Sequence, residues 1–97
     1  MTAAEERVRG AVLGVLGRIA PEADPAGLPP DAPLRRELDL DSVDFQNFTI
    51  LLCRELGIDI PERDAQRLTS IGACIALLTP LVLTRDRSAD RGSGPRS

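Results

Sequence analysis

Apolar residues at three- and four-residue spacings run through this sequence and restrict what it can fold into. The first stripe lies near the N-terminus and consists of Val8, Val12, Val15, Leu16 and Ile19. The second consists of Phe45, Phe48, Leu52 and Leu56, with Leu51 beside it. Such spacings place side chains on one face of an α-helix, and no segment shows the strict alternation of a strand. The sequence therefore predicts an all-α protein.

Length and composition limit the size of this fold. The chain has 97 residues, of which 2% are aromatic, so we expect one small domain with a modest aliphatic core. A capping-box pattern, Thr2 with Glu5, begins a first helix that ends near Ile19. Prolines then break the helical pattern over residues 20–33, which predicts a long first loop. We predict a small four-helix bundle, either right-angled or up-and-down.

The second and third helices follow this loop. Residues 34–38 fit a single turn of helix, and a second helix is expected over residues 42–56. Gly57 stands where a left-handed residue ends a helix. Pro61 suits the first turn of a short third helix that runs through Leu68.

The last helix and the tail complete the expected organisation. Thr69 or Ser70 caps a fourth helix, which we expect to end where Pro80 interrupts it. The composition after residue 83 is rich in Ser, Gly and Arg and is typical of disorder. We therefore expect a folded domain over residues 1–83 and a disordered C-terminal tail over residues 84–97.

The charge pattern excludes several classes of function. The net charge is −3, the basic residues are all arginine and histidine is absent, so nucleic-acid binding is disfavoured. The N-terminus lacks the features of a signal peptide, and no apolar run approaches the roughly 20 residues of a membrane span. We expect a monomeric, cytoplasmic protein that does not bind membranes.

The segment Leu-Asp-Ser-Val-Asp, residues 40–44, carries the strongest chemical signal. A serine at a helix start is a preferred N-cap, and a capping box is not expected because Phe45 lies three residues beyond Ser42. A helix start also favours an attached phosphate, because its N–H groups lack intrahelical partners and the helix dipole is positive there. Ser42 is thus either a cap, an attachment point, or both.

Three motifs together make residues 34–78 similar to an acyl carrier protein. They are Asp41-Ser42 before a helix, Gly57-Ile58-Asp59-Ile60-Pro61 after it, and Thr69-Ser70-Ile71-Gly72 opening the last helix. The resemblance implies that Ser42 carries a 4′-phosphopantetheine arm, which a separate phosphopantetheinyl transferase supplies from coenzyme A, with Asp41 orienting this reaction. It also implies partners that load acyl groups onto the arm and transfer them from it, and an acyl carrier domain over residues 1–83.

No residues here suggest catalysis or a metal site. The sequence has no histidine to act as a catalytic base and no lysine to form a Schiff base, so we expect a carrier and not an enzyme. A calcium loop of the EF-hand type needs glycine where Asp44 stands, so no metal is expected. Cys74 shares the spacing of the apolar residues around it and is predicted to be buried, whereas Cys53 is interpreted as incidental.

A second face of the helix over residues 42–56 is the expected partner surface. It consists of Val43, Asn47, Ile50 and Arg54, with Asp44 beside them. Two of these residues are apolar although they lie off the core stripe, which is typical of a docking surface. The alternative is an ordinary, partly exposed helix.

The same helix departs from the carriers of central fatty-acid synthesis, which usually present glutamates along it where this chain has Asn47, Cys53 and Arg54. Asp39 also stands where many carriers have glycine. With fewer acidic residues, this helix attracts basic partner enzymes less strongly, which favours a discrete carrier of a specialised, polyketide-like pathway. A composition rich in alanine, with arginine as its one basic residue type, is consistent with that. Two alternatives stay open: an unmodified, carrier-like module that docks a partner through Val43 and Ile50, and a small helical regulatory subunit.

Overall fold

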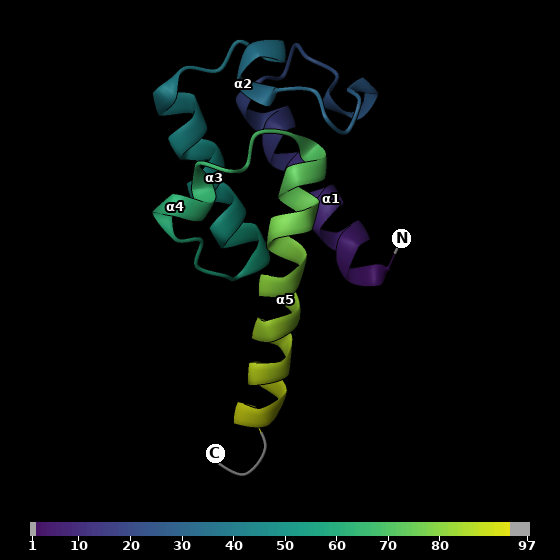
Figure 1. The fold of residues 1–97 in the computed structure, drawn as a ribbon, viewed down its shortest axis with the longest axis vertical. Helices are drawn as coiled ribbons and strands as arrows, with labels where there is room; N and C mark the ends of the chain where they lie inside the picture. The colour runs from purple at the N-terminus through teal and green to yellow at the C-terminus, as the bar shows by residue number, and fades with distance from the viewer. Residues whose placement is uncertain (1, 94–97) are drawn as a thin grey trace.

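The computed structural model describes the backbone of residues 2–93 and the side chains of residues 2–85, and in that part of the chain all regular secondary structure is helical, without strands (Figure 1). The helices are α1 (Ala3–Ile19), α2 (Leu34–Glu37), α3 (Ser42–Leu56), α4 (Glu62–Ala65) and α5 (Ile71–Ser93), with a 3-10 turn, η1 (Pro25–Gly27), in the first loop. The all-α prediction is confirmed. The turn expected over residues 34–38 is α2.

Helix α1 begins at the predicted capping box. Thr2 Oγ1 accepts a hydrogen bond from the Glu5 N–H at 3.1 Å, and Glu5 Oε1 accepts one from the Thr2 N–H at 2.8 Å. Hydrogen bonding of the Glu5 carboxyl to the Thr2 backbone N–H, and then to the Thr2 side chain, lowers the pKa of that carboxyl. Exposed glycines weaken the helix intrinsically, so its stability comes from four buried residues: Val8, Val12, Val15 and Leu16.

Helices α1, α3 and α5 enclose the core. Helix α1 packs against both of the others, and α4 lies beside α3 (Figure 1). Phe48, Leu52 and Leu56 of α3 are at most 1% exposed, whereas Phe45 and Leu51 are only partly buried at the edge of the core. The predicted stripe of α3 is therefore confirmed as the face that packs inward.

The long first loop is fastened to the start of α5. The Gly72 N–H donates to the Pro30 carbonyl at 2.8 Å, and the Leu34 N–H donates to the Thr69 carbonyl at 2.8 Å. A Cβ atom at position 72 would lie 3.0 Å from the Pro30 oxygen, so this close approach requires glycine. The bond from Leu34, the first residue of α2, also holds α2 close to the start of α5.

Two predicted helix boundaries are wrong. Helix α4 occupies Glu62–Ala65 only, with Pro61 as its N-cap, and does not continue to Leu68. Helix α5 does not end at Pro80 but continues to Ser93. Proline inside a helix costs about 3 kcal/mol, but Leu78 and Val82 on either side of it are fully buried and hold both turns against the core.

Helix α5 also corrects the expectation of a disordered tail. Residues 84–93 are helical, and residues 94–97 lie outside the described part of the chain. The Arg85 Nε atom donates a hydrogen bond to the Gly57 carbonyl at 3.0 Å, just beyond the end of α3. The helix thus contacts the bundle beyond residue 83, while a domain boundary between residues 83 and 84 stays a prediction.

Gly57 ends α3 in the left-handed conformation, as predicted, with φ of 66°. We expect Gly57→Ala to lower the free energy of unfolding by about 1–2 kcal/mol, because a Cβ atom is strained at this φ. Urea denaturation measures the change. Gly14→Ala is the matched control, because Gly14 lies inside α1 with nothing near its Cβ position, and it should stabilise by about 0.5–1 kcal/mol. Equal changes in the two variants would contradict this account.

Candidate functional site

Ser42 is the first residue of α3, and the N-cap is Asp41. The Asp44 N–H donates to Asp41 Oδ1 at 2.8 Å, and the Asp41 N–H donates to Asp44 Oδ2 at 3.3 Å. The interpretation of Ser42 as the cap, and the expectation that no capping box forms, are therefore wrong. The register is shifted by one residue, which places Asp44 and not Phe45 at the third helical position.

This shift leaves the Ser42 hydroxyl uninvolved in capping. The side chain is exposed and forms no hydrogen bond with any other described residue. The N–H groups of Ser42 and Val43 lie in the first turn, where no intrahelical carbonyl can reach them. A group attached to this oxygen therefore lies at the positive end of the α3 dipole, and a phosphodiester fits there.

A tight turn presents Ser42 at the surface. The Leu40 N–H donates to the Arg35 carbonyl at 2.8 Å, and Asp39 has φ of 54°, in the left-handed region that glycine favours. Aspartate is one of the residues that tolerate this conformation. The backbone thus accounts for Asp39 at a position where glycine is usual in the family that this chain resembles.

Arg35 is a site neighbour that sequence reasoning missed. Its guanidinium carbon lies 5.7 Å from the centre of the Phe45 ring, and Phe45 is three residues beyond Ser42 on α3. The two residues are ten positions apart in the sequence and lie on different helices, so spacing along one helix gave no signal for the contact.

A groove begins at Ser42 and runs between α3 and α4; we call it the serine groove. Its volume is about 570 Å³. Its lining residues are Ser42, Phe45, Gln46, Thr49, Ile50, Ile60, Glu62, Ala65 and Gln66. Phe45, Ile60 and Ala65 are half-buried, whereas Gln46, Glu62 and Gln66 are exposed. The groove therefore combines an apolar floor with polar edges.

A second groove, on the other side of Ile50, contains most of the predicted partner surface; we call it the α1–α3 groove. Its volume is about 580 Å³, and its lining residues are Arg18, Ile19, Asp44, Asn47, Ile50, Leu51 and Arg54. Val43 lies outside this groove but is 62% exposed, and Ile50 is 44% exposed. Sequence reasoning missed Arg18 and Ile19, because they belong to the end of α1.

The charges around the α1–α3 groove are unequal along α3. Asp44 lies at the Ser42 end and is engaged in the capping box, whereas Arg54 lies at the far end and has no hydrogen bond or ion pair with another described residue. Arg18 pairs with Glu55 at 2.9 Å. The surface is therefore acidic near the serine and basic away from it.

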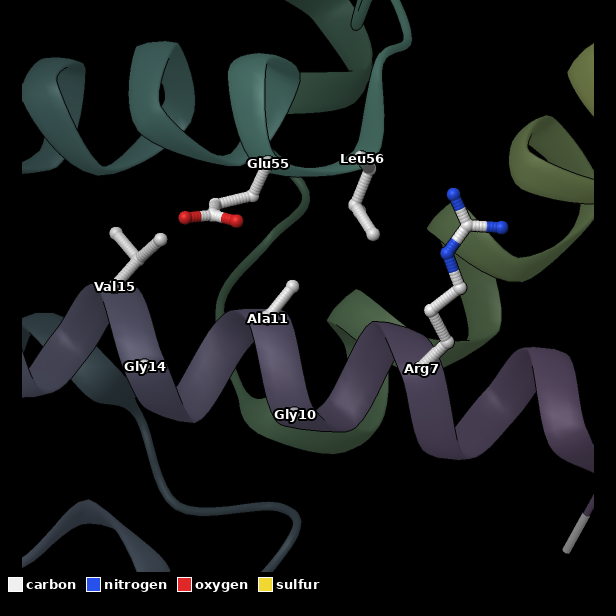
Figure 2. A pocket seen from close by; sticks show the side chains of 7 residues that line it. All are labelled: Arg7, Gly10, Ala11, Gly14, Val15, Glu55 and Leu56. Carbon is white, nitrogen blue, oxygen red and sulfur yellow. The ribbon is translucent and has the colours of Figure 1, made fainter.

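A third hollow lies between α1 and α3, on the stretch of α1 that carries Gly10 and Gly14 (Figure 2). Figure 2 shows Ala11, Val15 and Leu56 pointing into the space between the two helices, with the Glu55 carboxylate at its edge. None of the predicted site residues lines it. Gly10 and Gly14 contribute no side chains to this space, which has a volume of about 350 Å³.

The cysteines lie apart from these grooves. Cys74 is fully buried in the core, and burial raises the pKa of its thiol to about 12. Cys53 is half-buried. Among the described residues no cluster of histidine, cysteine or carboxylate side chains has the arrangement of a metal site. In the same part of the chain no helix is both long and apolar enough to cross a bilayer.

Comparison with known proteins connects this geometry to a family. A family model described as a phosphopantetheine attachment site matches residues 6–78. The chain is 32% identical over 68 residues to a Schizosaccharomyces pombe protein provisionally named as a mitochondrial acyl carrier protein. That match covers 70% of this chain but only 61% of the relative. No solved structure matches the chain.

The helical fold and the matched residues define a phosphopantetheine-binding carrier. Within that class, the chain belongs to the acyl carrier protein family. Its cofactor is 4′-phosphopantetheine, which is held covalently and supplies a thiol for thioesters. An exposed hydroxyl at a helix start beside an open groove fits such a group.

The expectation of a cytoplasmic protein is wrong by the same comparison, because the S. pombe relative is named as mitochondrial. The expectation rested on the absence of signal-peptide features and of a long apolar run. Both features concern secretion and membrane insertion, so they could not separate the cytoplasm from an organelle.

Proposed function

We propose that this chain holds acyl intermediates as thioesters on an arm attached to Ser42. The observation that carries the proposal is the exposed Ser42 hydroxyl at the first position of α3, with the cap supplied by Asp41. Asp41 keeps the helix start in place through Oδ1, which accepts from the Asp44 N–H, so it positions the serine for the transferase. The protein supplies recognition, and the arm supplies the chemistry.

Intact mass spectrometry tests this function directly. Purified protein treated with coenzyme A and a broad-specificity phosphopantetheinyl transferase should gain the mass of one arm, and proteolysis should place it on the peptide containing Ser42. An unmodified protein would favour the alternative, a carrier-like module that docks a partner permanently through Val43 and Ile50.

The partner enzymes dock, in this proposal, on Val43, Asp44, Asn47, Ile50 and Arg54, together with Arg18 and Ile19. Val43 and Ile50 are the apolar residues of α3 that stay exposed, and burying them in a complex contributes about 1–2 kcal/mol each. Asn47 and Arg54 take the place of acids on this face, so binding to basic enzymes should depend little on salt. This surface supports a specialised, polyketide-like pathway over central fatty-acid synthesis.

Ile50→Glu should slow acyl loading of the arm-bearing protein by its pathway's acyl transferase about tenfold, because a charge replaces an apolar contact in the complex. Loading is followed by mass spectrometry and helicity by circular dichroism. Leu83→Glu is the matched control, because Leu83 is 46% exposed, close to the 44% of Ile50, but lies on α5. Equal slowing in both variants, or none in Ile50→Glu, would contradict the docking surface.

A further inference from the structure

The charges next to Ser42 in the sequence are negative. Asp39, Asp41 and Asp44 all lie within three residues of it, and all three are at least partly exposed. A phosphodiester on Ser42 adds a further negative charge to this group, and like charges a few ångströms apart repel each other. A cation beside the serine would offset that repulsion.

Arg35 supplies a cation in this position. Its Nε atom donates a long hydrogen bond of 3.5 Å to the Leu40 carbonyl, and its guanidinium carbon lies 5.7 Å from the centre of the Phe45 ring. Leu40 is two residues before Ser42, and Phe45 is three residues after it. The guanidinium therefore contacts both the turn that precedes the serine and the first turn of α3.

The two terminal amino groups of Arg35 remain available to a further partner. A guanidinium has five N–H donors, and the bond to Leu40 uses the one on Nε. Neither terminal amino group forms a hydrogen bond or an ion pair with another described residue. A phosphodiester presents two unbridged oxygens, and the planar guanidinium matches such a pair with two parallel hydrogen bonds.

We propose that the guanidinium of Arg35 binds the phosphodiester that joins the arm to Ser42. Arg35 is then a positioning residue, which holds the base of the arm beside α2 and takes no part in bond formation. This inference rests on the proposed function, since it requires an arm on Ser42. The diphosphate of coenzyme A has the same chemistry before transfer, and the experiment separates these two sources of phosphate.

The phosphorus NMR signal of the arm-bearing protein tests this inference, because the arm carries one phosphate group. The unsubstituted protein is compared with Arg35→Gln, Arg35→Lys and Arg36→Gln, each treated with the transferase until attachment is complete. Arg36→Gln is the matched control, because Arg36 is the next residue of α2, is exposed, and has a side chain without a hydrogen bond, ion pair or ring contact to another described residue. The same proteins unfolded in urea give the signal of a phosphodiester without a partner.

We expect Arg35→Gln to move the phosphorus signal toward its position in the unfolded protein, while Arg36→Gln leaves it in place. Arg35→Lys should restore part of the difference, because it keeps the charge; a purely structural contact of the planar guanidinium with Phe45 would not be restored by lysine. Added salt should move the signal of the unsubstituted protein in the same direction as Arg35→Gln, because salt screens an exposed ion pair. Circular dichroism checks that each variant keeps its helices.

Urea denaturation supplies a second measurement. Arg35→Gln should change the equilibrium constant of unfolding about two- to fivefold more in the arm-bearing protein than in the unmodified one, as an exposed ion pair does. Equal changes in the two forms would overturn the inference, as would a phosphorus signal that moves equally in Arg35→Gln and Arg36→Gln.

The rate of attachment identifies the other source of phosphate. Slow or absent attachment to Arg35→Gln, with no change in the phosphorus signal of any arm-bearing product, would assign Arg35 to coenzyme A and overturn the inference. Failure to attach the arm to the unsubstituted protein would instead overturn the proposed function.

Discussion

Replacing Ser42 with alanine is expected to abolish attachment of the arm completely, because in the proposed function its hydroxyl oxygen forms the bond to phosphate. The fold should be retained. Because Asp41 and not Ser42 caps α3, the free energy of unfolding should change by no more than about 0.5 kcal/mol, the range of ordinary surface substitutions. Mass spectrometry after transferase treatment and urea denaturation measure the two effects.

Ser70→Ala is the matched control for this experiment. The Ser70 hydroxyl oxygen accepts from the Ala73 N–H at 3.1 Å at the start of α5, so it is a serine that does cap a helix. Its removal should cost about 1 kcal/mol of stability and leave arm attachment intact. Attachment to the Ser42→Ala variant would show that another residue carries the arm, and a large loss of stability in that variant would show that Ser42 has a structural role.

Phe48→Ala should be the most destabilising of the substitutions considered, with a loss of about 3–5 kcal/mol in the free energy of unfolding. Phe48 is fully buried at the centre of the α3 stripe, and its ring centre lies 5.6 Å from that of Phe45. Domains of this size are stable by only about 5–15 kcal/mol, so the variant should be close to unfolding at room temperature. Urea denaturation followed by circular dichroism measures the loss.

Val43→Ala, on the exposed face of the same helix, is the comparison for Phe48→Ala. Val43 is 62% exposed, so its truncation should change stability by no more than about 0.5 kcal/mol. Similar losses in the two variants would mean that the face of α3 assigned to the core is wrong.

Helix type and packing face could be predicted from the sequence, because both depend on spacing within a single segment. The stripe that ends in Leu56 and the glycine at position 57 were sufficient for α3. The end of α5 was wrongly predicted at Pro80. The free-energy cost of a proline inside the helix is offset by the burial of Leu78 and Val82, and that burial exists only in the folded bundle. The bounds of α3 were predicted correctly, but its N-cap was assigned to Ser42 instead of Asp41, because serine and aspartate are equally good caps.

The candidate site could also be predicted only in part. Ser42 could be proposed as the attachment residue from its neighbours in the sequence, and the exposure of Val43 and Ile50 could be predicted from their helical spacing. The grooves could not be predicted, since each is shared by two elements whose relative placement exists only in the folded bundle; Arg18 of α1 and Arg54 of α3, for example, line the same groove. Their lining depends on how the helices cross.

The burial of Cys74 also affects how long a thioester survives while it waits for the next enzyme. A thioester is lost when a thiolate or an amine attacks it, and the raised pKa keeps this thiol protonated well above neutral pH. The sequence has no lysine, and Cys53, the other thiol, is half-buried. The carrier therefore presents few nucleophiles to its own cargo, and self-acylation is disfavoured by the composition of its surface.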